Sequence, residues 1–393
     1  MLKENVLVFG TGSLYLENRG KIKNKYNVMS LIDNDFRKHG TYIDDMEILS
    51  PEKINEFYYD FIIISSSYES DIFFQLIKLG VPKEKVIFLR FAINSESASV
   101  FSHLLTSGVF YQSTGITGEN LSIVILSYNR VDMTIRLLSS IEKYMNDFLG
   151  EIIVFDNGSK SSELVKLNLY LRNYPLSYSL IESSDNLGVA KGRNRAMLHA
   201  RNDWVFFIDN DIFFIENPLP RIDETILKFN SPYINLPLLN NDLETICSFG
   251  GNITLDHGYL SVVPFMNEGS SRLFVDTIME SKISFGSFLF GGSSVYHKDN
   301  FMRMGGFDES LFIGFEDLIF SMLLIKSGVR VANISDFYMV HDHARPSDYE
   351  YNNVRYDIKT IKNSADTAFS KYGVNMYSDD VEKWLQSRTK KVI

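Results

Sequence analysis

Short apolar runs separated by helical spacing organise the first part of the chain. Runs typical of buried strands occur at Val6–Phe9, Val28–Ile32, Phe61–Ser65 and Val86–Leu89. Helical spacing follows the third run and continues to Leu79, where Gly80 ends it. Apolar strands that alternate with helices indicate a small parallel sheet. We therefore expect an α/β module over residues 1–92.

A second alternating series begins at Leu121. Strand patterns lie at Ser122–Leu126, Ile152–Phe155, Tyr178–Glu182 and Trp204–Ile208, and helical spacing lies at Met133–Tyr144, Leu164–Asn173, Val189–Arg201 and 316–327. Residues 219–290 are less regular, and the tail has helical stretches around 353–371 and 379–388. A Ser-, Thr- and Gly-rich stretch without a sustained period separates the two series and predicts a linker. The predicted parts are a module at 1–92, a linker at 93–119, an α/β domain at 120–345 and a helical extension at 346–393.

Charge and cysteine usage narrow the class of protein. The net charge of −10 argues against sequence-independent nucleic-acid binding, which needs a basic face. The single cysteine, Cys247, excludes an intramolecular disulfide and fits a reducing compartment. The chain has neither a signal peptide pattern nor an apolar run of about 18 residues, so we expect a soluble cytoplasmic protein. Basic residues near its end leave peripheral membrane association open.

A glycine loop closes the first strand of the module. Gly10-Thr11-Gly12 with Asp33 further along is similar to a dinucleotide-binding turn, but Tyr15 occupies the place of the third glycine. The pattern also resembles small Rossmann-like modules at the front of some polysaccharide-biosynthesis proteins. Because the glycine motif is incomplete, we favour a structural module whose ligand site is vestigial or serves protein contacts.

Polar motifs end the strands of the second series. They are LSYNR at 126–130, FDNGS at 155–159, DNLGVAKGRNRAM at 185–197 and DND at 209–211. Ligands of open α/β sheets bind beyond the carboxyl ends of the strands. These four motifs therefore form the candidate site.

The helix predicted after the third motif places one arginine on its apolar face. At 100° per residue Arg193 shares a face with Val189, Ala196, Met197 and Ala200, whereas Lys191 and Arg195 point elsewhere. A phosphate would suit this guanidinium near a helix N-terminus. A structural ion pair with Asp156 or Asp185 is an equally good interpretation of the chemistry alone.

WVFFIDNDIFFIENP, residues 204–218, sets two aspartates in an apolar run. Asp209 and Asp211 are two residues apart, so on an extended chain both project to one side while Asn210 points away. Carboxylates at this spacing suit Mg²⁺ or Mn²⁺, which keeps positions open for phosphate oxygens. The alternative, a surface turn with solvated acids, is disfavoured by the flanking aromatic residues.

The order of the motifs resembles one family. LSIVILSYNR, IIVFDNGS, DNLGVAKGRNRAM, WVFFIDND and the stretch from GGSSVYHKDNF to MVHDH are similar to GT-A-fold glycosyltransferases of family 2, over about residues 120–343. The resemblance implies an inverting enzyme that moves a sugar from a nucleotide-diphosphate donor, with UDP favoured, to a hydroxyl of a glycan or lipid-linked acceptor. It also implies a hexosyl- or N-acetylhexosaminyl-type transfer and a divalent metal, Mn²⁺ or Mg²⁺.

The same resemblance implies roles for individual residues. Asp156 matches the acid that contacts the nucleotide base, Arg193 matches an arginine near the nucleotide, and Asp211 and His341 match metal-site residues. Asp209 matches the acid near the ribose and the metal's water shell. The implied nucleotide-binding set is Ser127, Tyr128, Asn129, Arg130, Asp156, Arg193, Asp209 and Asn210, and the implied metal set is Asp209, Asp211 and His341.

The general base is expected at the Glu316-Asp317 pair. The family usually carries a further acid two residues later, where this chain has Ile319. We favour Asp317, whose ionised form a helix N-terminus would stabilise, and we expect Glu316 to cap that helix. His343 is left open as a second contributor beside His341.

Two other functions compete with the transferase. A non-catalytic sugar-nucleotide-binding scaffold is disfavoured because it has no need of clustered carboxylates. A sugar nucleotidyltransferase is disfavoured because the loop from Gly10 to Leu14 lies in a separate module. The resemblance is of a bacterial surface-polysaccharide kind, such as capsule synthesis, which would place the protein at the inner face of the plasma membrane or free in the cytoplasm. A homo-oligomer remains open.

Overall fold

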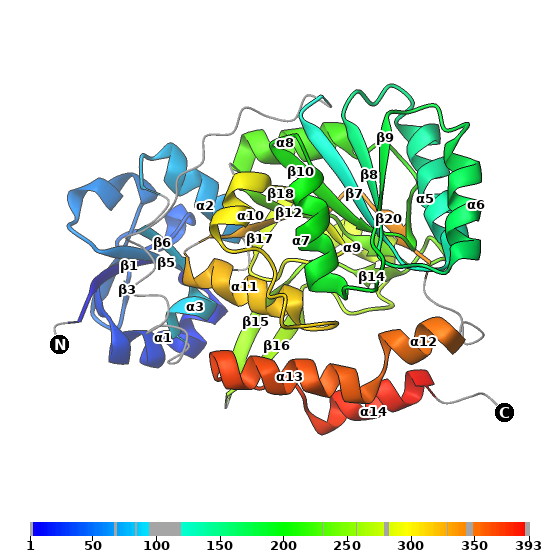
Figure 1. Ribbon diagram of the computed structural model, residues 1–393. Coiled ribbons are helices and arrows are strands. Elements are labelled where there is room, and N and C mark those ends of the chain that lie inside the picture. Colours follow the sequence, from blue (N-terminus) through cyan, green and yellow to red (C-terminus); the bar gives the residue numbers. More distant parts are fainter. Residues whose placement is uncertain are drawn as a thin grey trace. The chain divides into compact units, whose positions relative to one another are not determined.

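The chain forms two compact units. The computed structural model describes residues 3–66, 69–82, 85–93, 119–229, 231–256, 258–278, 283–327, 329–342 and 349–389. The first unit comprises Met1–Val109 with Ile325–Val329, and the second comprises Phe110–Leu324 with Arg330–Ile393 (Figure 1). Residues 94–118 of the predicted linker lie outside the described residues, so the domain boundaries stay a prediction.

The described part of the first unit contains a six-stranded sheet in the order β3-β4-β2-β1-β5-β6. Its strands are parallel except for the β3–β4 pair. The strands are β1 (Asn5–Phe9), β2 (Asn27–Ile32), β3 (Tyr42–Ile43), β4 (Met46–Leu49), β5 (Phe61–Ile64) and β6 (Val86–Phe88), and the helices are α1 (Ser13–Lys25), α2 (Glu69–Lys78) and α3 (Leu89–Ile93). The parallel sheet expected from the apolar runs is therefore confirmed.

Tyr15, at the position of the missing third glycine, belongs to the core of this unit. Its side chain is fully buried and packs with Val6, Val8, Ile22 and Leu31. Burial is the main reason why the pKa of its hydroxyl is raised to about 12. The substitution that breaks the dinucleotide pattern thus serves the packing of α1 against the sheet.

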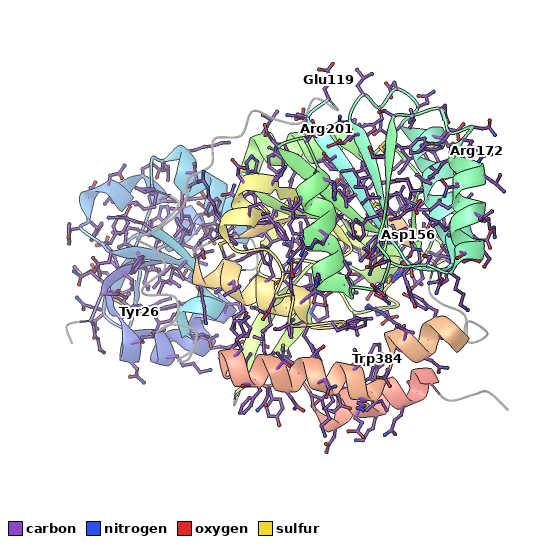
Figure 2. The ribbon with its side chains drawn as sticks, viewed as in Figure 1. Tyr26, Glu119, Asp156, Arg172, Arg201 and Trp384 are labelled. Carbon is purple, nitrogen blue, oxygen red and sulfur yellow. The ribbon has the colours of Figure 1, made fainter. Side chains whose placement is uncertain are left out.

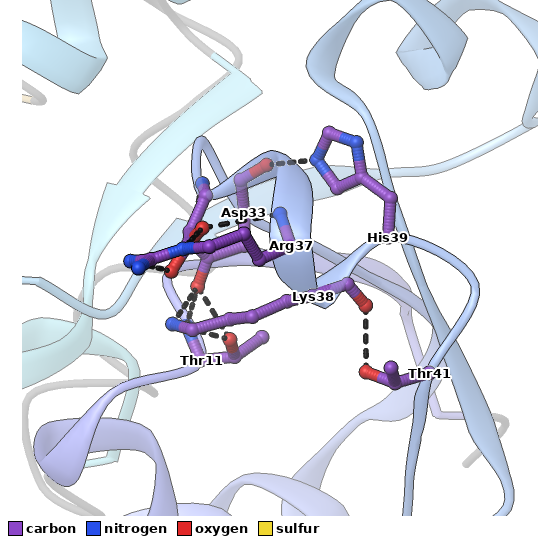
Figure 3. A network of polar contacts seen from close by, with 7 residues as sticks. Thr11, Asp33, Arg37, Lys38, His39 and Thr41 are labelled. Atoms are coloured by element: carbon purple, nitrogen blue, oxygen red, sulfur yellow. Dashed lines mark hydrogen bonds and ion pairs between the residues drawn. The ribbon is translucent and has the colours of Figure 1, made fainter.

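Asp33 holds the glycine loop through hydrogen bonds of its own carboxylate. Asp33 Oδ2 accepts hydrogen bonds from the backbone N–H of Thr11 at 3.0 Å, from the Thr11 hydroxyl, and from Lys38 Nζ at 2.8 Å (Figure 3). Asp33 Oδ1 accepts the backbone N–H of Asp35 at 2.9 Å. Both oxygens are therefore engaged within the protein, whereas a dinucleotide site would need this acid for a ribose. This geometry supports the structural interpretation of the module.

The second unit is built on a mixed sheet whose parallel half carries the predicted motifs. In its described part the order is β17-β19-β12-β18-β10-β7-β8-β9. One half of the sheet contains the parallel strands β7 (Leu121–Ser127), β8 (Glu151–Asp156), β9 (Tyr178–Glu182) and β10 (Trp204–Asp209). The other half contains β12 (Tyr233–Asn235), β17 (Ile283–Gly286), β18 (Ser293–His297) and β19 (Val331–Ile334), of which β12 and β19 pair in parallel. Register pairs Ser127 with Asp156 and Leu126 with Asp209. Three strand ends therefore meet at one edge of the sheet.

Smaller sheets and helices complete this unit. The remaining strands are β11 (Ile212–Phe214), β13 (Leu238–Leu239), β14 (Ile246–Ser248), β15 (Gly251–Asp256), β16 (Tyr259–Pro264) and β20 (Met339–His341). The helices before the C-terminal extension are α5 (Val131–Tyr144), α6 (Ser161–Leu171), α7 (Val189–His199), α8 (Leu219–Phe229), α9 (Arg272–Ile278), α10 (Lys298–Arg303) and α11 (Glu316–Lys326). Every strand and helix expected between residues 121 and 216 is present to within a few residues, but the strands of the less regular region were not anticipated.

An aromatic cluster fixes the start of α11 against β10 and β18. Phe207 packs on Tyr296 with ring centroids 5.1 Å apart, and Phe320 of α11 lies 5.2 Å from Phe301 and 5.3 Å from Phe307. Such aromatic pairs add roughly 0.5–1.5 kcal/mol each beyond the burial of their area. The acidic pair at the start of α11 is thereby held in place relative to the end of β10.

Three helices form the C-terminal extension, α12 (Tyr349–Arg355), α13 (Ile358–Tyr372) and α14 (Asp379–Thr389). The helical stretch expected around 353–371 is present as two helices, because Asp357 starts a new helix by accepting the backbone N–H of Thr360 at 2.8 Å. Ile361 and Leu385 pack against Ile313 in the loop before α11. Trp384 of α14, labelled in Figure 2, has its ring centroid 5.5 Å from that of Tyr356.

No helix in the described residues is long and apolar enough to cross a bilayer.

Replacing Asp33 should destabilise the first unit. Asp33→Ala removes the buried acceptor of Thr11 and Lys38, so we expect a loss of about 2–3 kcal/mol in the free energy of unfolding of this unit. Hydrogen exchange measured by mass spectrometry on the full chain should show faster exchange in β1 and α1. The exposed control Glu52→Ala should exchange at the wild-type rate, and equal rates in both variants would contradict the role of Asp33.

Candidate active site

The loop after β7 is shaped by two residues with left-handed backbone. Asn129 and Arg130 have φ values of 50° and 45°. Asn129 donates its backbone N–H to Ser159 Oγ at 2.7 Å, and its side-chain oxygen accepts the backbone N–H of Lys160 at 2.9 Å. Ser127 is buried and its hydroxyl lies 2.9 Å from that of Thr134. Ser127 and Asn129 therefore brace the loop, and Leu126 and Tyr128 are the residues of this motif that line the cavity beyond it.

Asn157 joins the end of β8 to the loop between β9 and α7. Its amide nitrogen donates to Asn186 Oδ1 and to the carbonyl of Gly188, both at 3.1 Å, and its oxygen accepts the Leu187 N–H at 3.0 Å. Beside it lies Asp156, buried at the end of β8 (Figure 2). One oxygen of Asp156 accepts the Ser159 N–H at 3.0 Å, whereas its Oδ1 has no hydrogen-bond partner among the described residues.

Arg193 is buried and bridges two carboxylates. Its Nη2 lies 2.5 Å from Asp209 Oδ1 and its Nη1 lies 3.3 Å from Glu316 Oε1. Burial disfavours the charge on this guanidinium, but the two acids outweigh that effect and raise its pKa. The structural ion pair envisaged from the sequence exists, but with these two acids in place of Asp156 or Asp185.

Two glycines make room for this ion pair. A Cβ on Gly291 would lie 2.2 Å from Arg193 Nη1, and a Cβ on Gly292 would lie 2.1 Å from Asp209 Oδ2. The Gly292 carbonyl also accepts the backbone N–H of Asp209 at 2.9 Å. Any larger side chain at these two positions would displace the charged groups.

The chain turns after Asp209, so the assumption of an extended DND stretch is wrong. β10 ends at Asp209 and residues 210 and 211 form a turn before β11. Asn210 is directed inward and donates to Thr134 Oγ1 at 3.1 Å. The two aspartates still line one cavity, but each has its own cationic partner.

Asp211 pairs with Arg130 and His341. Its Oδ2 lies 3.1 Å from Arg130 Nη1 and its Oδ1 lies 3.3 Å from His341 Nε2. Burial alone would raise the pKa of Asp211, but His341 and Arg130 lower it to about 2. Burial would likewise lower the pKa of His341, whereas its contacts with Asp211 and Cys247 raise it to about 10. A solvated surface turn is excluded, because Asp211 is only 7% exposed.

Glu316 and Asp317 open α11 in different environments. Glu316 pairs with Arg193 and its Oε2 has no partner among the described residues, so it caps no backbone N–H and the capping prediction is wrong. Asp317 faces the cavity and accepts the N–H of Leu318 at 2.8 Å. Burial, and then the charge of Glu316, raise the pKa of Asp317 to about 7. The helix dipole, which we expected to favour its ionised form, is therefore outweighed.

The C-terminal extension contributes to the same cavity. Tyr351, Val354 and Arg355 of α12 line it. The Tyr351 ring lies 4.3 Å from the guanidinium carbon of Arg130. These residues were not predicted, because a polar helix beyond the recognised motifs carries no signal that it returns to the strand ends.

The cavity gathers most of the predicted site. Its volume is about 140 Å³, below the roughly 300–1,000 Å³ of small-molecule pockets, so it would hold only part of a ligand of that size. Predicted residues that line it are Tyr128, Arg193, Asp209, Asn210, Asp211, Glu316 and Asp317, and lining residues that the sequence did not single out include Asn157, Asn186, Gly291, Gly292, Tyr351 and Arg355. Arg130 and His341 contact Asp211 and so adjoin the cavity. Ser127, Asn129 and Asp156 are not among its lining residues, and His343 lies outside the described residues.

Known families match both units. Residues 122–230 match the Glycosyl transferase family 2 model, and residues 2–87 match the model of the C2185-like N-terminal domain. An uncharacterized glycosyltransferase, YfnE, of Bacillus subtilis is 35% identical over 91 residues, which are 23% of this chain and 23% of that protein. An uncharacterized glycosyltransferase of Haemophilus influenzae is 29% identical over 115 residues, 29% of this chain and 36% of that protein. The matches thus span well under half of these two relatives.

Two solved structures are also similar. GalNAc-T7 with UDP, GalNAc and Mn²⁺ has a TM-score of 0.48 at 16% identity, covering 72% of this chain and 56% of its own. Staphylococcus aureus TarS 1–349 has a TM-score of 0.39 at 19% identity, covering 64% and 72%. Both TM-scores lie below 0.5, so the assignment rests on the family match and on the motifs at the strand ends. Residues 122–230 of the second unit therefore carry a domain that matches glycosyltransferase family 2.

Proposed function

We propose that the chain is an inverting glycosyltransferase that moves a sugar from a nucleotide-diphosphate donor to an acceptor hydroxyl. The observation that carries this proposal is the placement of Asp317, with its pKa raised to about 7, in the same cavity as Asp209 and Asp211. A carboxylate with this pKa is suited to take a proton at neutral pH. The neighbouring acids supply the side of the cavity on which a metal-bound diphosphate would lie.

The donor nucleotide would lie over the ends of β7 and β8. Asp156 Oδ1 is buried and has no partner among the described residues, so it can accept an N–H from a base such as uracil. Tyr128 lines the cavity at the end of β7 and can pack against the base or ribose. This arrangement supports UDP as the first nucleotide to test.

The donor set near Asp211 fits a hard divalent ion. Asp211 and His341 are adjacent, whereas Asp209 is engaged by Arg193. The described residues contain no group of three or more acids, histidines or cysteines placed to hold a metal. Two protein ligands nevertheless suffice for an ion that completes its shell with water and phosphate oxygens. Asp211 and the neutral form of His341 would hold Mn²⁺ or Mg²⁺, so that metal binding would displace the imidazolium proton. The ion would neutralise charge on the diphosphate when bound.

The reaction then needs one displacement at the anomeric carbon. The acceptor oxygen forms a bond to that carbon as the bond to the diphosphate oxygen breaks, and the electron pair leaves with the diphosphate. Asp317 takes the proton of the acceptor hydroxyl. Because one displacement inverts the configuration, the site needs no second carboxylate as nucleophile, in contrast to retaining glycosidases.

Arg193 acts through its neighbours in this scheme. Its two hydrogen-bonded acids hold it inside the protein, where it positions Asp209 and offsets the charge that Glu316 would otherwise impose on Asp317. Removing one partner from a buried ion pair lowers the free energy of unfolding by about 3–5 kcal/mol. Glu316 is accordingly a positioning residue, and Asp317 is the proposed base.

The acceptor and the biological setting follow from the family analogy. We propose a hexosyl- or N-acetylhexosaminyl-type transfer to a glycan or lipid-linked saccharide in bacterial surface-polysaccharide synthesis. Cytoplasmic action, with peripheral contact to the membrane or self-association, is consistent with this role. A non-catalytic scaffold gains no specific support, because a scaffold would not require a carboxyl tuned as Asp317 is.

Nucleotide and metal together should stabilise the protein. Thermal unfolding with UDP, GDP or dTDP should show a higher melting temperature for one nucleotide, and the increase should depend on Mn²⁺. Asp211→Asn should lose the metal-dependent part of the increase, while the exposed control Glu52→Ala should keep it. The absence of an increase with all three nucleotides would contradict the proposal.

Asp317→Asn should abolish turnover but preserve donor binding. We expect the rate of nucleoside diphosphate release from the donor to fall by roughly 10²–10⁴-fold, the usual contribution of a general base. In the wild type this rate should fall as pH drops through about 7, because protonation of Asp317 removes the base. Unchanged turnover in Asp317→Asn would assign the base to another group.

Gly292→Ala should damage the site without an added charge or polar group. The new Cβ would meet the Asp209 carboxylate at 2.1 Å, so the carboxylate and Arg193 must move. We expect turnover to fall by roughly 100-fold, the scale of a 1 Å misplacement in an active site. Gly20→Ala, where the Cβ meets nothing within 4 Å, is the matched control and should retain full turnover. Wild-type turnover in Gly292→Ala would refute the steric argument.

A further inference from the structure

We propose that Arg355 of α12 binds the phosphate groups of the donor and of the leaving nucleotide, which makes the C-terminal extension part of the active site. The inference rests on the proposed function. Arg355 lines the cavity that Asp209, Asp211 and Asp317 also line.

The other cations of the site are already engaged. Arg193 is bound by Asp209 and Glu316, and Arg130 lies 3.1 Å from Asp211. His341 shares Asp211 with Arg130. A diphosphate that leaves with added negative charge needs a cation whose hydrogen-bond donors are not already held by acids.

Arg355 meets that need. Among the described residues it forms no hydrogen bond or ion pair, although it lies in the field of Asp209 and Glu316. Burial disfavours its charge, but the neighbouring Tyr351, Asp209 and Glu316 raise its pKa, so it remains positively charged at any working pH. Its guanidinium can donate two parallel hydrogen bonds to one phosphate.

The position of α12 is secured from both sides. Tyr351 stacks on Arg130 at 4.3 Å, and therefore contacts the side of the site at which Arg130 meets Asp211. Tyr356, directly after α12, packs with Trp384 of α14 and belongs to the cluster around Ile313. Ser364 of α13 also donates to the Ile313 carbonyl at 3.0 Å. Arg355 is thus presented by a helix tied to the loop that leads into Glu316 and Asp317.

Binding affinities for ligands that carry different numbers of phosphate groups test this assignment. Calorimetric titration of the full chain with Mn²⁺ would compare the nucleoside diphosphate that stabilises it most, the corresponding monophosphate and the nucleoside. Arg355→Ala should weaken the affinity for the diphosphate by roughly 10- to 100-fold, a typical loss for a charge-assisted contact. The affinity for the nucleoside should stay within about threefold of the wild-type value. The diphosphate affinity of Arg355→Lys should lie between those of the wild type and Arg355→Ala, because lysine keeps the charge without the planar fork.

Controls separate this contact from a structural role. Lys362→Ala removes a positive charge from an exposed position of α13 and should bind all three compounds as the wild type does. If Arg355→Ala fails to fold, Arg355→Gln and Arg355→Lys carry the comparison. Equal weakening of all three compounds, or an unchanged diphosphate affinity, would overturn the inference. A wild-type protein that binds no nucleotide would instead overturn the proposed function.

Discussion

The buried guanidinium of Arg193 is the constraint on which the arrangement of the site depends. It joins α7 to the end of β10 through Asp209 and to the start of α11 through Glu316. A charge buried in this way must be paired, so the three elements cannot shift independently. The glycines at 291 and 292, and the turn that follows Asp209, are consequences of fitting this ion pair at a sheet edge.

Asp211 and Asp317, the other two acids of the site, have different pKa values because their surroundings differ. Asp211 has two cationic partners and a pKa lowered to about 2, whereas burial and the charge of Glu316 raise the pKa of Asp317 to about 7. Pairs of carboxyl groups with separated pKa values are typical of acid–base sites. His341 and Arg130, which come from other elements, lower the pKa of Asp211, whereas burial and the adjacent Glu316 raise that of Asp317.

The sequence predicted the strand ends well, because apolar strands and the polar motifs after them are local signals. The motifs predicted Asp156, Arg193 and Asp209 at one sheet edge, where strand register and the Arg193–Asp209 ion pair bring them together. Prediction from the sequence failed where partners are distant in the chain: Glu316 pairs with Arg193 across 123 positions, and Arg355 returns from a polar helix. It also failed at α1, where only Tyr15 and Ile22 are buried and no apolar period can form.

The most direct test of the account is a structure of the full chain with Mn²⁺ and the nucleoside diphosphate that it binds. The account predicts the diphosphate in the cavity of the second unit, between the Asp211–His341 pair and Arg355, with the base beside Asp156. A nucleotide bound elsewhere, or one whose phosphates contact neither Asp211 through the metal nor Arg355, would contradict it.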